Sequence, residues 1–399
     1  MKKALVITSR NPYPISGGDK KRIDSIINSL DRNNFEVTLI THEITIFPTK
    51  IFFQKSFKPF LKKEVKVYVS YLELFLNLLK ALISDKPFQY FLYYSPKLKK
   101  FLKKNNENFE ICIYHLLRTS IYKKSVNAEK HILEMTDSLS LNYAREIESF
   151  RSSIYLKGIP FFLILEIERK KLLKMEIMAA QEFDSVILVS GIDKTYLENK
   201  SKKIHKIPYI IIPLLGEVKN PSRFYEKENK YLFLGQLSYR PNLKALNWLL
   251  NEIHPEVTSR LPQVELVIIG SNPPKNFSIL EKKHKGVKFI GFVEKLEPHF
   301  FSSVLSVAPM KTGAGMQNKV IDSLSHGIPI VTTSIGLGDI KLKVDDEIFV
   351  SDNGKDFADR IIEIFQNKEK YISLDQKYKN AIKDNYGEEI FDSKLKEIF

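Results

Sequence analysis

The stretch KYLFLGQLSYRPNLKALNWLLNEIHPEVTSRLPQVELVIIGS, residues 230–271, decides the fold. It predicts an apolar strand, a loop with glycine and proline, an amphipathic helix over 243–253 and a second apolar strand. The first half of the chain has the same pattern, with strands at KALVITS (3–9) and EVTLITH (36–42) and a helix over 20–30 between them. Strands alternating with helices predict parallel sheets covered by helices on both faces. We therefore expect an α/β protein built from doubly wound sheets.

The length of the chain predicts more than one domain. A chain of 399 residues exceeds the usual size of a single domain, and 43% hydrophobic with 27% charged content is typical of globular proteins. The polar, proline-containing segment 203–230 is the expected hinge. We predict an N-terminal domain over 1–205, a C-terminal domain over 206–370, and final helices over 371–399 that cross back to the N-terminal domain.

Cysteine content and hydropathy bear on the location of the protein. The single cysteine, Cys112, lies in an apolar run, so no disulfide can form within the chain, which fits a reducing cytosol. Residues 1–8 have a short apolar stretch without a cleavage site and are expected to be the first strand. No run approaches the roughly 18 apolar residues that cross a bilayer. We expect a cytoplasmic protein.

The formal net charge of +15 predicts an anionic partner: nucleic acid, anionic lipid or the phosphates of a nucleotide sugar. The lysine clusters are spread along the chain, which does not favour a single nucleic-acid module, and each alone is typical of solvated surface. The clusters at 50–66 and 97–104 also contain aromatic residues and flank an apolar helical pattern over 71–83. That combination could rest on the inner face of the cell membrane.

The strongest chemical signal is PMKTGAGMQNKVIDSLSHGIPIVTT, residues 309–333. A strand ends there, a glycine-rich turn follows, and a helix begins. The turn Gly313-Ala314-Gly315 offers backbone N–H groups to an anion at a helix N-terminus. Lys319 and Asp322 lie three residues apart on one helix face, where the cation suits a diphosphate and the carboxylate suits ribose hydroxyls. Taken alone, these residues fit a capped surface helix with an ion pair equally well.

This stretch resembles the donor-site signature of family 4 glycosyltransferases, and most closely that of a bacterial subgroup of exopolysaccharide-associated sugar transferases. The resemblance extends over 231–333 and includes SRNPYPISGGDKKR (9–22), EMTDSLS (134–140) and QEFDSVILVS (181–190). It implies the GT-B fold, with two facing Rossmann-like domains and a cleft between them. The implied reaction moves a sugar from a nucleotide-diphosphate sugar to a hydroxyl acceptor with retention of anomeric configuration, in surface polysaccharide or glycoconjugate synthesis. Relatives act on lipid-linked or polysaccharide acceptors.

The resemblance also implies roles for residues of the C-terminal domain. Asp322 stands where the family usually has a glutamate for the donor ribose, and Lys319 matches a lysine expected at the diphosphate. Ala314 stands where the family has its other carboxylate, so the usual pair of glutamates is incomplete here. Gln236 stands where many relatives have arginine. The remaining donor-side residues are Gly291, Phe292 and Val293 near the nucleobase, and Gly313, Gly315, Met316, Gln317 and Asn318 near phosphate or sugar. Asn318 as a helix cap and Gly291 as a turn glycine are the plain alternatives.

In the N-terminal half, Gly17 and Gly18 open the loop before the first helix, where small residues let a ligand approach the backbone. Relatives use this loop near the donor phosphate and the acceptor. Lys21 and Arg22 follow; they could face phosphate, but solvent is the favoured interpretation.

Asp137 and His115 each follow an apolar run that predicts a strand. Asp137 resembles a recurring aspartate of the subgroup on the acceptor side, although an N-cap for a helix beginning near Leu139 is favoured. His115 is a rival for the acceptor-side role, and a structural histidine is the commoner outcome. With Lys319, these are the candidate catalytic residues.

Other chemistries lack their motifs. HExxH, GxxxxGK[ST] and GxSxG are absent, as is the DxD that metal-dependent glycosyltransferases use, so we expect no metal and no cofactor besides the nucleotide-sugar co-substrate. The charge of the leaving nucleoside diphosphate would be met by Lys319, the turn amides and the helix N-terminus. Two alternatives remain: a non-hydrolysing nucleotide-sugar epimerase, which needs several acids where only Asp137 is well placed, and a non-catalytic sugar-nucleotide or nucleic-acid binding module supported only by charge.

Overall fold

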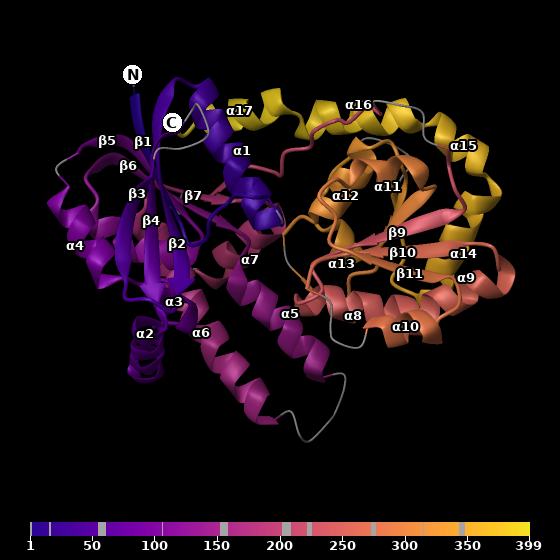
Figure 1. The fold of residues 1–399 in the computed structure, drawn as a ribbon, viewed down its shortest axis with the longest axis horizontal. Helices are drawn as coiled ribbons and strands as arrows, with labels where there is room; N and C mark the ends of the chain where they lie inside the picture. The colour runs from indigo at the N-terminus through magenta and orange to yellow at the C-terminus, as the bar shows by residue number, and fades with distance from the viewer. Residues whose placement is uncertain are drawn as a thin grey trace. The chain divides into compact units, whose positions relative to one another are not determined.

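The computed structural model divides the chain into two compact units (Figure 1). The N-terminal domain comprises Met1–Pro213 and Asp392–Phe399, and the C-terminal domain comprises Leu214–Phe391. The division falls later than the expected boundary at 205, and only the last part of the expected crossing segment 371–399 groups with the N-terminal domain. The structure describes residues 2–15, 17–54, 61–105, 107–151, 159–201, 209–221, 226–272, 277–313, 315–342 and 348–399; part of the expected hinge lies outside them.

The N-terminal domain is built on an eight-stranded sheet with the order β3-β4-β2-β1-β5-β6-β7-β8. All neighbouring strands are parallel except the edge pair β3 and β4, which is antiparallel. The strands are β1 (Lys2–Thr8), β2 (Phe35–Thr45), β3 (Lys50–Gln54), β4 (Leu61–Ser70), β5 (Phe109–His115), β6 (Ala128–Thr136), β7 (Ser185–Leu188) and β8 (Tyr209–Ile211). The central strands β1 and β5 are buried almost throughout, as expected for a sheet covered on both faces.

Helices of the N-terminal domain connect these strands, and α5 and α6 run side by side (Figure 1). They are α1 (Gly18–Arg32), α2 (Tyr71–Ile83), α3 (Phe88–Leu92), α4 (Pro96–Lys104), the 3₁₀ helix η1 (Leu117–Ser125), α5 (Leu139–Arg151), α6 (Ile159–Glu182) and α7 (Gly191–Lys200). Because β1, β5 and β6 are parallel neighbours, their carboxyl ends meet at one edge: Thr8 pairs with His115, and His115 pairs with Glu134. Ligands of doubly wound sheets bind at this edge.

The C-terminal domain has a six-stranded, fully parallel sheet with the order β11-β10-β9-β12-β13-β14. The strands are β9 (Lys230–Leu234), β10 (Glu265–Ile269), β11 (Val287–Gly291), β12 (Leu305–Ala308), β13 (Ile330–Thr332) and β14 (Ile348–Val350). The helix expected over 243–253 begins earlier, as α8 (Arg240–Trp248), and continues through the π-helix η3 (Leu249–Ile253) into α9 (His254–Arg260). The prediction of an α/β protein with two doubly wound sheets is confirmed.

The last helices divide between the two domains. Within the C-terminal domain, α16 (Asp375–Tyr386) packs against α12 (Asn318–Ser325). The end of α17 (Glu388–Lys396) belongs to the N-terminal domain, where Arg32 pairs with Asp392 at 2.6 Å. The other helices are α10 (Phe277–Lys283), α11 (Glu297–Ser302), α13 (Ser334–Leu337), α14 (Gly354–Gln366) and α15 (Lys368–Ser373). Among the described residues, no helix has the length and hydropathy needed to cross a membrane.

Candidate functional site

The glycine-rich turn leads from the carboxyl end of β12 into α12. Gly313 and Gly315 have φ angles of +141° and +69°, in the region that residues with a Cβ rarely adopt. Gln317 is the N-cap of α12 and makes no side-chain hydrogen bond to the helix start. Asn318 is the first helical residue, so the alternative that it caps the helix is wrong. The N-terminal amides of α12 therefore lack the usual side-chain cap, an arrangement that favours an anion. Ala314 lies outside the described residues.

Lys319 is a half-buried residue just after this turn, and its ammonium end is desolvated. Its Nζ donates to Oδ1 of Asn242 at 2.9 Å, lies 3.5 Å from Sδ of Met310 and sits 5.5 Å from the ring centroid of Phe233. No carboxylate of the described residues pairs with it, so the expected alternative of an ion pair with Asp322 is wrong. Burial lowers the pKa of Lys319 to about 8. A desolvated ammonium group without an acidic partner is costly unless an anion binds there.

Asn242, a residue that the sequence analysis did not single out, holds Lys319 in place. It lies in α8 and is buried. Its Nδ2 donates to the backbone carbonyl of Gln236 at 3.0 Å, while its Oδ1 accepts from Lys319. The side chain of Gln236 itself donates to Ser238 Oγ at 2.9 Å. Asn242 thus joins the loop after β9 to the turn after β12.

The carboxyl end of β11 carries the residues expected near the nucleobase. Gly291 has a φ angle of +83°, so the backbone favours glycine there whether or not a base binds beside it. Phe292 has an exposed ring, and Val293 packs against the apolar cluster that includes Leu234 and Ile269. The nucleobase contact stays a prediction.

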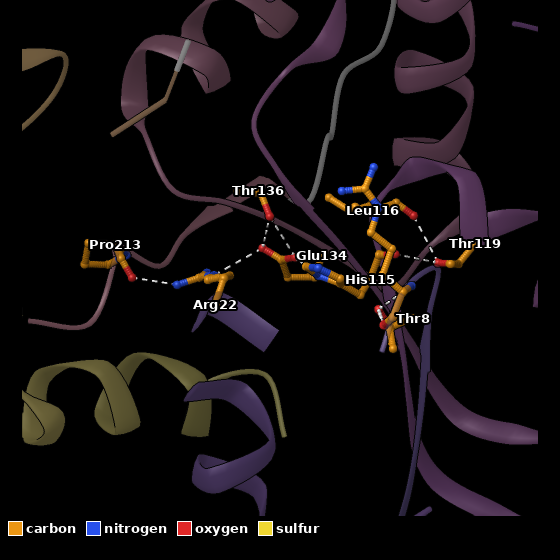
Figure 2. Close-up of polar contacts among 9 residues, drawn as sticks. Thr8, Arg22, His115, Leu116, Thr119, Glu134, Thr136 and Pro213 are labelled. Atoms are coloured by element: carbon orange, nitrogen blue, oxygen red, sulfur yellow. Dashed lines mark hydrogen bonds and ion pairs between the residues drawn. The ribbon is translucent and has the colours of Figure 1, made fainter. Parts of the chain in front are cut away.

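In the N-terminal domain, Glu134 is the centre of a buried polar network (Figure 2). Nδ1 of His115 lies 2.6 Å from the Glu134 carboxylate, Nε of Arg22 lies 3.2 Å from it, and the Thr136 hydroxyl lies 3.0 Å from both of its oxygens. Burial alone would raise the pKa of Glu134, but His115 and Arg22 hold it below its ordinary value. Arg22 also donates to the carbonyl of Pro213 at 2.6 Å.

This network bears on the expected roles of Arg22 and His115. Arg22 is only 2% exposed, so the interpretation that it faces solvent is wrong. His115 is equally buried and is bound to Glu134, which suits a positioning role. An acidic residue within an apolar strand run, as in HILEMT, was the available signal for Glu134. Its partner Arg22 is 112 residues away in sequence.

The backbone is strained where β5 and β6 end. Leu116 and Thr136 have φ angles of +68° and +64°. Residues other than glycine rarely adopt this region, and a β-branched residue such as threonine does so least readily. Such strain gathers at functional sites. These two residues directly precede Leu117 and Asp137, so the strain marks this edge of the sheet as a candidate site.

Asp137 lies between β6 and α5, at the carboxyl edge of the N-terminal sheet. The Oγ of Ser138 accepts from the amide of Leu141 at 3.2 Å and caps α5, so the alternative that Asp137 is the N-cap is wrong. Its Oδ1 is buried and has no partner among the described residues. Burial raises the pKa of Asp137, and the charges of Asp193 and Glu134 raise it further. A carboxyl group with a raised pKa is suited to accept or hold a proton.

The loop before α1 has the ordinary geometry of a helix start. Gly17 is the N-cap of α1, with an extended φ of −176° that any residue adopts and without a side-chain cap. Gly18 begins the helix, and the amide of Lys21 donates to the carbonyl of Gly17 at 3.0 Å. Close approach of a ligand to Gly17 and Gly18 stays a prediction.

Comparison with protein families shows a match to the C-terminal domain. Residues 228–367 match the family model described as Glycosyl transferases group 1. The matched range includes Lys319 and Asp322. The match and the fold support a GT-B glycosyltransferase.

Comparisons over the full length of the chain found a similar protein and similar solved structures. The chain is 23% identical, over 100% of both chains, to a Klebsiella pneumoniae protein described as an uncharacterized 44.6 kDa protein in the cps region. The structure resembles sucrose-phosphate synthase from Thermosynechococcus elongatus with a TM-score of 0.71 and 14% identity, covering 100% of this chain and 98% of that one. It also resembles Anabaena HepE in complex with UDP and glucose, with a TM-score of 0.60 and 12% identity, covering 100% and 99%. These structural likenesses show the GT-B fold.

Within the described part of the GT-B chain, no group of three or more histidine, cysteine or acidic side chains could hold a metal ion. The expectation of a reaction without a metal remains a prediction, because the donor itself contributes oxygen ligands when it binds.

Proposed function

We propose that the chain transfers a sugar from a UDP-sugar to a hydroxyl acceptor. The observation that carries the proposal is the desolvated ammonium group of Lys319, which pairs with no carboxylate of the described residues. It lies beside a helix N-terminus without a side-chain cap, at the carboxyl edge of the C-terminal sheet. A diphosphate would supply the missing negative charge and accept hydrogen bonds from the amides. UDP is the proposed nucleotide because the similar HepE structure holds UDP and glucose.

The other donor-side residues take their roles from their position around Lys319. Asp322 follows on the same face of α12, where its carboxylate would accept hydrogen bonds from the ribose hydroxyls. The backbone at Gly291, Phe292 and Val293 would contact the base. Gln317 would bind phosphate or sugar oxygens, together with Met316 and Asn318 at the helix start.

The proposed reaction retains the anomeric configuration, as in family 4. The bond between the anomeric carbon and the diphosphate breaks, the bond to the acceptor oxygen forms on the same face, and the acceptor proton passes to the departing phosphate oxygen. Lys319 and the turn amides stabilise the charge that develops on UDP. Asp137 would accept a hydrogen bond from the acceptor hydroxyl, and His115 with Glu134 would position that edge. The proposed reaction uses no metal or other cofactor.

The proposed setting is surface polysaccharide or glycoconjugate synthesis at the inner face of the cell membrane. The Klebsiella pneumoniae relative from a cps region supports the pathway class. Several apolar side chains of α2 are exposed, among them Leu72, Phe75, Leu82 and Ile83, and exposed apolar surface of this kind suits a lipid-linked acceptor at a membrane surface.

The test is the substitution Lys319→Ala. Thermal-shift measurements with UDP-, GDP-, TDP- and CMP-sugars first identify the donor. Release of the nucleotide from that donor is then followed with and without an extract of lipid-linked oligosaccharides. Loss of the ammonium group should lower the transfer rate by about 10²-fold or more.

Lys311→Ala is the matched control, because Lys311 belongs to the same turn but its ammonium group lies over the ring of Trp248, 3.4 Å from the centroid. This variant should keep most of the activity. Near-normal transfer by Lys319→Ala would refute the assignment. Isomerisation of the donor sugar without an acceptor would favour the epimerase instead.

A further inference from the structure

Two arginines meet on one tyrosine at the carboxyl edge of the N-terminal sheet. Arg10 follows β1, and Arg118 lies in η1 just after β5; these two strands are neighbours. Nε of Arg10 lies 3.4 Å from the hydroxyl of Tyr93, and the guanidinium carbon of Arg118 lies 5.0 Å from the centroid of the same ring. Two cations are therefore held within reach of one ligand.

Within the described part of the chain, Arg118 has no counter-ion. It forms no hydrogen bond or ion pair with any described residue, and its Nε is buried. Arg10 is paired with Asp19, but loosely, at 3.5 Å and in an exposed position. Burial lowers the pKa of Arg118, and the charge of Arg10 lowers it further. A desolvated arginine beside a second cation destabilises the folded chain unless an anion compensates.

The groups around Arg118 leave the cluster positive at neutral pH. Burial lowers the pKa of His42 to about 4, and the charge of Arg118 contributes to the shift, so that imidazole is neutral. The pKa of Tyr143 is raised by burial, so its phenol is neutral as well. Asp19 is a carboxylate whose charge acts on Arg118, and it is already paired with Arg10. Two guanidinium groups thus face one carboxylate.

We propose that Arg118 and Arg10 bind a phosphate group carried by the acceptor. This inference rests on the proposed glycosyl transfer, since it names the class of acceptor as a phosphate ester. The planar guanidinium group binds phosphate oxygens in a bidentate manner, as it also binds carboxylates. A phosphate monoester carries close to two negative charges at neutral pH, which matches two arginines better than the single charge of a carboxylate or a neutral sugar hydroxyl does. The amides at the start of α1, which Gly17 leaves without a side-chain cap, supply further donors. Asp137 lies at the same edge of the sheet, where the acceptor hydroxyl would react.

The experiment measures the binding of inorganic phosphate and of UDP to the full chain by isothermal titration calorimetry. Arg118→Gln should weaken phosphate binding by about tenfold or more, the loss expected for hydrogen bonds to a charged group. The same variant should bind UDP as the unmodified protein does. Phosphate should also still bind when UDP is saturating, because the two sites are distinct.

Arg169→Gln is the control, since it removes the same charge from the same domain while Arg169 is paired with Glu166. It should leave phosphate binding unchanged.

The proposal is overturned if both variants lose phosphate affinity equally, or if Arg118→Gln loses none. If Arg118→Gln weakens the binding of UDP as much as that of phosphate, the proposal is also overturned, because Arg118 would then bind the diphosphate of the donor. If Arg118→Gln does not fold, Arg118→Lys takes its place, with the same expected loss of the bidentate contact. Failure of the unmodified protein to bind UDP would contradict the proposed function and leave the phosphate site standing.

Discussion

Lys319 should make donor binding depend on pH. Because burial lowers its pKa to about 8, the free protein loses this positive charge above that pH, whereas a bound diphosphate would hold the proton in place. Affinity for UDP should therefore fall above about pH 8, by a factor approaching ten per pH unit. Calorimetric titration with UDP across this range measures the effect.

Lys319→Arg is the matched variant, because its guanidinium group keeps its charge throughout the range. Its affinity for UDP should not fall between about pH 7 and about pH 9.5. An affinity of the unmodified protein that is constant over the same range would contradict the role given to Lys319.

The sequence predicted those candidate residues that are marked by neighbours close to them in the chain. Lys319 and Asp322 stand three apart on a helix after a glycine turn, so their shared face follows from helical geometry. Asn242 and Arg118 carried no such signal. Asn242 acquires its role by bonding Lys319, 77 residues away, and Arg118 by approaching Tyr93 from a different part of the chain. Such contacts depend on the order of strands in a sheet, which periodicity does not reveal.

At the scale of elements, α6 anchors the start of α5 through Glu176. This carboxylate accepts from the amide of Ser140 and the hydroxyl of Ser138, both at 3.2 Å, and burial raises its pKa to about 7. The native state therefore binds a proton more tightly than the unfolded chain between about pH 4.5 and about pH 7. The contribution of Glu176 to stability is full below that window and is lost as pH rises through it.

Replacing Glu176 by Gln should remove this dependence. Relative to the unmodified protein, Glu176→Gln should gain roughly 2–3 kcal/mol of stability between about pH 5 and about pH 7.5, because the amide does not ionise. Urea unfolding at several pH values measures the difference. Glu166→Gln, on the same helix and partly exposed, should show no such trend. A parallel pH dependence in Glu176→Gln and the unmodified protein would contradict the assignment.

Elements were predictable where hydrophobic periodicity alone defines them. The strand, loop, helix and strand of each domain followed from local patterns, because buried parallel strands are apolar runs. In the basic and aromatic segment 50–104, the helical pattern expected over 71–83 is confirmed as α2. The strands β3 and β4 were not predicted there, because their antiparallel pairing is set by tertiary contacts. Helix starts were similarly uncertain: Ser138, and not Asp137, caps α5.

At the scale of the whole molecule, the charge and one exposed helix favour an anionic membrane surface. The chain has 62 basic and 47 acidic residues, a net charge of +15. On α2, Leu72 and Leu82 are 69% and 64% exposed, and Lys80 lies exposed between them. Apolar side chains enter the lipid boundary while lysines meet anionic headgroups, and the two contributions add. Binding should therefore need anionic lipid and should weaken with salt.

Sedimentation with vesicles separates these contributions. The unmodified protein should bind vesicles containing phosphatidylserine and should bind purely zwitterionic vesicles far less. Leu82→Ser should weaken binding by about tenfold, since it removes one large apolar side chain from the lipid boundary. Ile279→Ser changes a similarly exposed residue, 60% against 64%, on α10 of the other domain, and should have no effect. If both substitutions weaken binding equally, or neither does, α2 is not the membrane-binding element, and the net charge alone would have to account for any association.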